Sequence, residues 1–142
     1  MVDRYAGRIS GPLRDRIDLW VHIPRVKPDE YMAAAAPEGS SAVRTRIAEA
    51  RTLQIARQGC LNSTLSGRAL RAQCRLTPAS HNHAIRLADL EGWSARGTER
   101  LLRVARTAAD LTGGAAVGSE HLDEAARFRA PGSSHVGWGA VG

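Results

Sequence analysis

The sequence is poor in aromatic residues, in lysine and in cysteine. Aromatic side chains make up only 4% of its 142 residues, so a core must be built mainly from Ala, Leu, Val and Ile, which suits closely packed helices. Lys27 is the only lysine among the 20 basic residues. The two cysteines, Cys60 and Cys74, form no C-x-x-C pair, and we expect two free thiols.

The sequence lacks the motifs that several functional classes require. No G-x-x-x-x-G-K-[ST] loop occurs, because Lys27 follows Arg25 and Val26, so the chain alone lacks a P-loop nucleotide site. No arrangement with a Ser/His/Asp or Cys/His signature is visible. The HNH tripeptide at 81–83 lacks further metal ligands, and we expect no metal site. The longest alanine run, 33–36, is too short to cross a bilayer, and the start has no signal peptide, so we expect a cytoplasmic chain without a membrane partner.

Positive charge is what the sequence has in surplus, with a net charge of +6 carried almost entirely by arginine. The guanidinium group is a planar fork that binds phosphates and carboxylates. An arginine-rich chain is therefore compatible with binding to nucleic acid or nucleotide, although the codon usage of a GC-rich genome would explain most of the bias. The positions of individual arginines are more informative than their number.

Periodicity and capping signals predict a mainly α-helical chain. Apolar and polar residues alternate over 17–23, which predicts one strand ended by Pro24, after a short helix over 12–16. Five helices should follow, over 40–58, 66–74, 77–91, 94–111 and 119–129. In the helix over 94–111, Leu101, Ala105 and Ala108 share the inner face, whereas the arginines at 100, 103 and 106 are interpreted as a solvated surface.

Two stretches of the sequence resemble the magnesium-chelatase-like AAA+ ATPases of the ComM (YifB) type. Residues 5–19 read YAGRISGPLRDRIDL, close to the family pattern that contains Ser-Gly-Pro-Leu-Leu-Asp-Arg-Ile-Asp-Leu. Downstream, WSAR at 93–96 and RLLRVARTAADL at 100–111 match the family, and LNSTLSGRALRAQC at 61–74 also fits. The resemblance covers about 5–129. Arg14 departs from it, because the family has leucine there.

The resemblance implies a fold and a division of the chain. Residues 1–26 would be the C-terminal remnant of the AAA+ nucleotide-binding core, and the strand over 17–23 would be the last strand of its sheet. A linker over 27–39 would lead to a helical lid over 40–130, a five-helix bundle, and a disordered tail over 131–142 would follow. The chain would be a truncated C-terminal portion of such an ATPase. It would lack the phosphate loop, which lies upstream in the family, and it is predicted to be inactive alone.

The resemblance also implies roles for two arginines. Arg16 matches the arginine finger, which acts in trans on the ATP of a neighbouring subunit. Arg96 matches the sensor-2 arginine, which contacts ATP phosphates in cis or in trans. The cofactors of the full-length family are ATP and Mg²⁺, neither of which we expect this chain alone to bind tightly. The partners are neighbouring subunits of a hexameric ring and, through the whole protein, DNA during branch migration in natural transformation.

Alternative interpretations stay open at this stage. The chain could be a stand-alone basic helical module that binds nucleic acid, or an inactive gene fragment. Arg16 could be an exposed charge paired with Asp15 or Asp18, which would contribute little to stability. Trp93 is interpreted as a residue of the lid core rather than as a platform for stacking bases.

Overall fold

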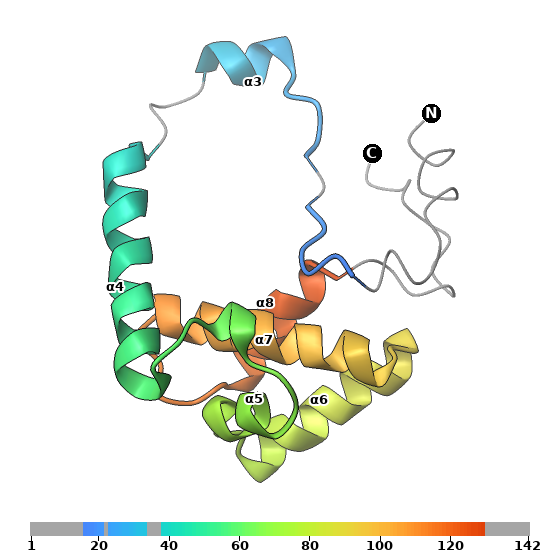
Figure 1. Ribbon diagram of the computed structural model, residues 1–142. Coiled ribbons are helices and arrows are strands. Elements are labelled where there is room, and N and C mark those ends of the chain that lie inside the picture. The colour runs from blue at the N-terminus through green and yellow to red at the C-terminus, as the bar shows by residue number, and fades with distance from the viewer. Residues whose placement is uncertain (1–15, 22, 34–37, 130–142) are drawn as a thin grey trace.

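The computed structural model describes residues 16–21, 23–33 and 38–129, and its regular elements are helical (Figure 1). The helices are α3 (Pro28–Ala33), α4 (Ser40–Gln58), the 3-10 helix η1 (Asn62–Thr64), α5 (Gly67–Cys74), α6 (Pro78–Glu91), α7 (Ala95–Leu111) and α8 (Ser119–Arg127). The prediction of a mainly α-helical chain with five helices after residue 39 is therefore confirmed. α3 lies inside the segment predicted to be a linker.

The strand expected over 17–23 does not form in the described part of that segment. Residues 17–21 and 23 carry no strand assignment, because a strand needs a ladder of hydrogen bonds with a neighbouring strand and the described residues offer none. Alternation of apolar and polar residues was therefore not sufficient evidence for a strand in this segment. The short helix over 12–16 lies outside the described residues except for Arg16, which is in a turn.

The ends of the helices follow from local capping chemistry. The hydroxyl of Thr77 accepts the N–H of Ser80 at 3.2 Å and the hydroxyl of Ser94 accepts the N–H of Gly97 at 3.1 Å, which satisfies backbone donors at the starts of α6 and α7. Gly59 ends α4 with φ of 74°, in the left-handed region that glycine adopts without strain. The N-cap of α4 is Gly39, and no side chain caps that end.

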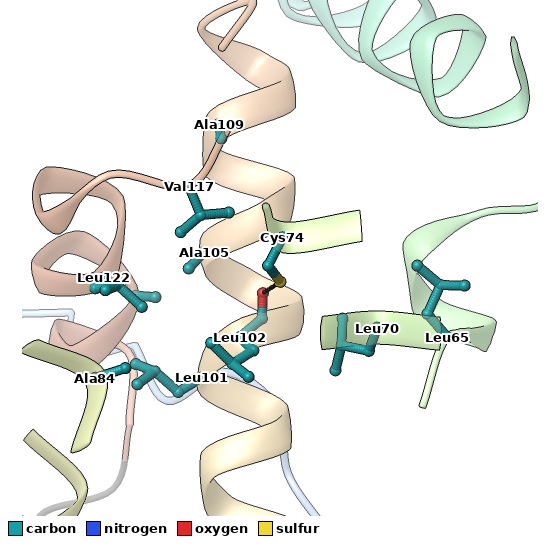
Figure 2. Packing of buried hydrophobic residues seen from close by; sticks show 11 residues of the cluster. Leu65, Leu70, Cys74, Ala84, Leu101, Leu102, Ala105, Ala109, Val117 and Leu122 are labelled. Carbon is teal, nitrogen blue, oxygen red and sulfur yellow. Dashed lines mark hydrogen bonds between the residues drawn. The ribbon is translucent and has the colours of Figure 1, made fainter. Parts of the chain in front are cut away.

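The core forms around α7, which α4, α5, α6 and α8 contact (Figures 1 and 2). The inner face of α7 carries Leu101, Ala105 and Ala108, as predicted, and all three are buried. Trp93 packs against this core, which confirms its assignment to the interior of the lid. The remaining buried apolar residues of the cluster are Leu65, Leu70, Cys74, Ala84, Leu102, Ala109, Val117, Leu122 and Ala125.

Both cysteines are free thiols, as predicted. The Sγ atom of Cys74 donates to the carbonyl oxygen of Leu102 at 3.7 Å inside the core (Figure 2). Burial raises the pKa of Cys74 to about 11, because a thiolate loses its hydration there. Cys74 therefore acts as a small apolar residue of the core rather than as a reactive group.

Only part of α4 packs against the bundle, and its opposite end extends away from the bundle (Figure 1). Ala50 and Gln54 are its buried residues, whereas Ile47 is 45% exposed. The apolar stripe that the sequence places on this helix is therefore covered at Ala50 but not at Ile47. None of the helices in the described residues is long and apolar enough to cross a membrane.

Candidate functional site

Residues 16–20 lie against the lid although they are far from it in sequence. The guanidinium of Arg100 donates through Nη1 to the carbonyl oxygen of Arg16 at 2.7 Å. The guanidinium of Arg129 donates to the carbonyl oxygen of Ile17 at 3.1 Å, and the N–H of Trp20 donates to the carbonyl oxygen of Phe128 at 2.7 Å. These hydrogen bonds fix the backbone on both sides of residue 18.

Asp18 adds an ionic contact at the same place. Its Oδ1 atom accepts a hydrogen bond from Nη1 of Arg100 and lies 3.5 Å from Nη1 of Arg103. Arg103 is itself held, because its Nε and Nη2 atoms donate to the carbonyl oxygen of Leu65 at 3.2 and 3.0 Å. The side chains of Arg100 and Arg103 are only 15% and 18% exposed. They are not part of a solvated helix face, and the sequence interpretation of these two arginines was wrong.

The two arginines assigned from the family resemblance are both close to Arg100, one through its backbone and the other along α7. Arg16 and Arg96 are both exposed, and neither guanidinium has an ion pair within the described part of the chain. Arg96 precedes Arg100 by one helical turn on the same side of α7, and Arg100 contacts the backbone of Arg16. The structure therefore brings both residues to one end of α7, and the roles assigned to them stay predictions.

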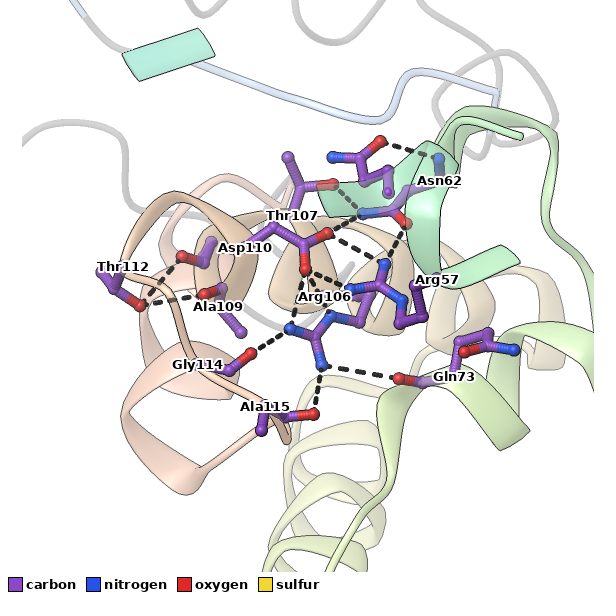
Figure 3. Close-up of polar contacts among 12 residues, drawn as sticks. Arg57, Asn62, Gln73, Arg106, Thr107, Ala109, Asp110, Thr112, Gly114 and Ala115 are labelled. Atoms are coloured by element: carbon purple, nitrogen blue, oxygen red, sulfur yellow. Dashed lines mark hydrogen bonds and ion pairs between the residues drawn. The ribbon is translucent and has the colours of Figure 1, made fainter. Parts of the chain in front are cut away.

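Arg106 is the clearest departure from the sequence interpretation. It was placed on the solvated face with Arg100 and Arg103, yet its side chain is fully buried. Its Nη2 and Nε atoms donate to Oδ1 of Asp110 at 2.8 and 3.2 Å (Figure 3). Its Nη1 atom donates to the carbonyl oxygens of Ala115 and Gln73 at 3.3 and 3.4 Å. A buried guanidinium must be both neutralised and hydrogen-bonded, and these partners meet that condition.

Asp110 joins Arg106 to α4 and η1 in one buried polar network (Figure 3). Its carboxylate also accepts hydrogen bonds from Arg57 and from Nδ2 of Asn62, the latter at 2.8 Å. The backbone N–H of Asn62 donates to Oε1 of Gln54 at 3.0 Å. Burial alone would raise the pKa of Asp110. The hydrogen bonds from Arg57 and Asn62 and the charges of Arg106 and Arg57 hold that pKa below its ordinary value.

Sequence reasoning missed this network, although one signal for it was present. Arg106 and Asp110 are spaced i, i+4, which brings opposite charges together on a helix. Their partners Arg57 and Asn62 come from elements about 50 residues away, and no local pattern predicts that pairing. The network fixes α4 and η1 against α7, so its role is to position the lid helices.

Of two cavities in the bundle, the first adjoins the site at Asp18 and Arg103, and the second is lined by other residues. One, of about 360 Å³, lies behind Asp18 and is walled mainly by apolar side chains, including Leu19, Val104 and Phe128. The other, of about 670 Å³, lies between α5, α6 and the start of α7, with Arg71, Arg75 and His81 among its lining residues. Within the described residues no group of three or more His, Cys, Asp or Glu side chains is placed to hold a metal ion.

Two family models match successive parts of the chain. Residues 37–129 match the model described as magnesium chelatase, subunit ChlI C-terminal, and residues 1–31 match magnesium chelatase, subunit ChlI. The chain belongs to the magnesium chelatase ChlI family. The resemblance drawn from the two sequence stretches is thereby confirmed.

The curated relatives that the chain resembles include proteins named YifB and ComM. It is 39% identical over 131 residues to the uncharacterized protein YifB of Salmonella typhimurium, covering 89% of this chain and 25% of that protein. It is 33% identical over 129 residues to competence protein ComM of Haemophilus influenzae, with the same coverage, and 37% identical over 134 residues to the uncharacterized protein Mb2921c of Mycobacterium bovis. The chain spans about a quarter of the length of these relatives.

The contacts around Asp18 join the two parts that the ChlI family models match separately. Arg16 and Asp18 lie in the part matched over 1–31, whereas Arg96, Arg100 and Arg103 lie in the part matched over 37–129. The interaction of Asp18 with Arg100 and Arg103 is therefore a contact between two modules of the family. Neither model by itself contains both partners.

Proposed function

We propose that this chain supplies the arginine finger and the helical lid of a magnesium-chelatase-like AAA+ ATPase of the ComM type. The observation that carries the proposal is the setting of Arg16. Its guanidinium is exposed, while its carbonyl oxygen is fixed to α7 by Arg100. An exposed guanidinium on a fixed backbone is suited to reach a phosphate on a neighbouring molecule, because little freedom is lost when it binds.

In this proposal Arg16 acts in trans, on ATP held with Mg²⁺ by the next subunit of a hexameric ring. A guanidinium there stabilises the negative charge that develops on the phosphoryl oxygens in the transition state. Arg96 acts as the sensor-2 arginine and contacts ATP phosphates. It is exposed and has no carboxylate partner within the described residues, which leaves its donors available to an anion.

The whole protein, in this proposal, is an ATP-driven ring that acts on DNA in the cytoplasm and serves branch migration during natural transformation. Two observations support a nucleic-acid partner. The net charge is +6, which favours association with a polyanion. The Haemophilus relative is named a competence protein.

The test is a chimera in which this chain replaces the matching quarter of the Salmonella YifB relative. Arg16→Ala should abolish most ATP turnover and leave ATP binding nearly intact, because the finger meets charge that grows in the transition state. The loss should be about a hundredfold or more in kcat. Arg16→Lys should rescue little, since an ammonium lacks the planar fork. Arg51→Ala is the matched control, because Arg51 is an exposed arginine on α4.

Mixing subunits separates action in trans from a defect within one subunit. The Arg16→Ala chimera should regain activity when mixed with subunits that keep Arg16 but carry a disabled phosphate loop, because each defect lies on a different side of a shared site. An Arg16→Ala chimera that turns over ATP like its parent would refute the proposal. So would a mixture that never recovers activity.

A further inference from the structure

The segment that carries Arg16 has no helix or strand of its own within residues 16–21 and 23. Within the described part of the chain, the long-range hydrogen bonds of its backbone are made with the lid. Arg100 and Arg129 donate to two successive carbonyl oxygens of the segment, those of Arg16 and Ile17. The N–H of Trp20 is bonded to the lid as well. These long-range hydrogen bonds hold the segment in place, as the ladder of hydrogen bonds holds a strand in a sheet.

Asp18 adds ionic contacts to these backbone hydrogen bonds. We call Asp18, Arg100 and Arg103 together the junction. Its carboxylate accepts a hydrogen bond from Arg100, which uses the same Nη1 atom to bind the oxygen of Arg16. Arg103 lies 3.5 Å from the same carboxylate oxygen and is itself bonded to the backbone at Leu65. The Asp18 side chain is 45% exposed, but both arginines are largely buried, so this junction is screened less than a surface ion pair.

One feature of the junction is unfavourable to folding. The Nε atom of Arg100 is buried and has no hydrogen-bond partner in the described part of the chain. A buried donor without a partner destabilises the folded state. Such an atom is commonly retained where a side chain is needed in one orientation for another purpose. The orientation of Arg100 is the one that holds the oxygen of Arg16.

We propose that Arg100 and Asp18 are positioning residues that fasten the backbone at Arg16 to α7, so that the lid sets where the Arg16 guanidinium lies. The inference rests on the proposed function of Arg16. Arg96 is one turn from Arg100 on the same helix, so a displacement of the start of α7 moves both. The lid helix thereby links the residue that senses a nucleotide to the residue that completes a neighbour's site.

The first experiment measures the junction in the full 142-residue chain by amide hydrogen exchange. The reporter is the N–H of Trp20, which bonds to the oxygen of Phe128. Arg100→Gln and Asp18→Asn should each speed its exchange by about tenfold, since the first removes the guanidinium and the second removes the carboxylate charge that strengthens the hydrogen bond. In the double variant the second change should add little, because both act on one junction. Arg51→Gln is the control, and it should leave the rate unchanged.

An internal reference separates release of the segment from unfolding of the lid. The N–H of Val117 bonds to the oxygen of Cys74 in the core at 2.9 Å, and its exchange should not change in any variant. Asp18→Asn is the safer change, since residue 18 lies outside the lid helices. If the amide of Trp20 exchanges at the parent rate in both Arg100→Gln and Asp18→Asn, the junction does not hold the segment and the proposal is wrong.

The second experiment measures the consequence for ATP turnover in the YifB chimera. Arg100→Gln and Asp18→Asn should lower kcat by up to about a hundredfold with little change in KM for ATP, because a misplaced finger affects the transition state more than binding. Arg100→Lys should recover part of kcat, since an ammonium can still donate to both oxygens. A residue that only supported folding would lower the amount of active enzyme without this graded recovery.

Arg16→Ala in the same assay distinguishes the proposed role of Arg16 as the arginine finger from the positioning role of Arg100 and Asp18. If Arg16→Ala loses turnover while Arg100→Gln and Asp18→Asn keep the parent kcat, the proposed function stands and the positioning role is overturned. If Arg16→Ala also keeps the parent kcat, the proposed function fails, and the positioning role fails with it.

Discussion

Removal of Asp110 should destabilise the lid more than any other single change to a charged residue. Its side chain is 1% exposed and pairs with Arg106, which is 0% exposed, and with Arg57, which is 15% exposed. In Asp110→Ala the guanidinium of Arg106 keeps only backbone oxygens as partners, and its charge is no longer neutralised. Breaking a buried ion pair by removing one partner costs about 3–5 kcal/mol of unfolding free energy.

Equilibrium unfolding in urea, followed by circular dichroism at 222 nm, measures this loss. A loss of this size should lower the thermal midpoint by about 15 °C or more in a domain of this length. Glu38→Ala is the matched control, because Glu38 forms a two-bond ion pair with Arg46 on the surface. Solvent screens that pair, so the midpoint should hardly move.

A double variant tests the cause. Arg106→Met with Asp110→Leu replaces both buried charges by apolar side chains, which is often neutral or stabilising. Arg57 can then turn to water and to Asn62. The double variant should therefore be more stable than Asp110→Ala alone. If Asp110→Ala unfolds at the same urea concentration as Glu38→Ala, or if the double variant is the less stable one, the network does not stabilise the lid by charge neutralisation.

Three further outcomes follow from the structure. The pKa of Asp110 is held below its ordinary value of 3.8, so the stability it contributes is complete above that pH and is lost as the pH falls through the depressed pKa; the acid unfolding of Asp110→Asn should be shallower. Half-buried Cys60 should react with a thiol reagent at pH 8, whereas Cys74, with its pKa raised to about 11, should react only after unfolding. Thr77→Ala and Ser94→Ala should each cost about 1 kcal/mol in urea unfolding, because each removes a cap from a helix start.

The helices were predictable from sequence because their signals are local. Thr77 before Pro78, Ser94 before α7 and Gly59 after α4 act on backbone groups a few residues away, and the predicted bounds agree with the structure to within two residues. The central position of α7 also follows from its sequence, since Leu101 and Ala105 lie on one side of it. Local chemistry is sufficient where the partner is in the same turn.

The site was predictable only in part, since its partners are distant in sequence. Arg16 and Arg96 were identified from the resemblance and their roles stay predictions, whereas the contacts of Arg100 and Arg103 with Asp18 connect residues more than 80 apart, which no local pattern predicts. Arg106 follows Leu102 by four residues and precedes Ala109 by three, and both are buried. That placement at the edge of the apolar stripe indicated burial, and the assumption that a charged residue faces water concealed it.

The segment over 17–23 shows how one sequence pattern can satisfy two different kinds of contact. Three of its alternating apolar residues are exposed in the structure, with Leu19 at 51%, Val21 at 63% and Ile23 at 82%, whereas Ile17 is partly buried. Asp18, the polar residue between Ile17 and Leu19, makes an ionic contact that holds the segment to the lid. The side chain that a strand would turn away from its apolar face is thus the one that α7 recognises. Residue 18 is in a bend, so the alternation of side chains along an extended strand does not set the direction of the Asp18 side chain. Leu19 lines the same cavity as Asp18, together with Val104 and Phe128, so the contact of the segment with the lid includes one of its apolar residues as well as its carboxylate.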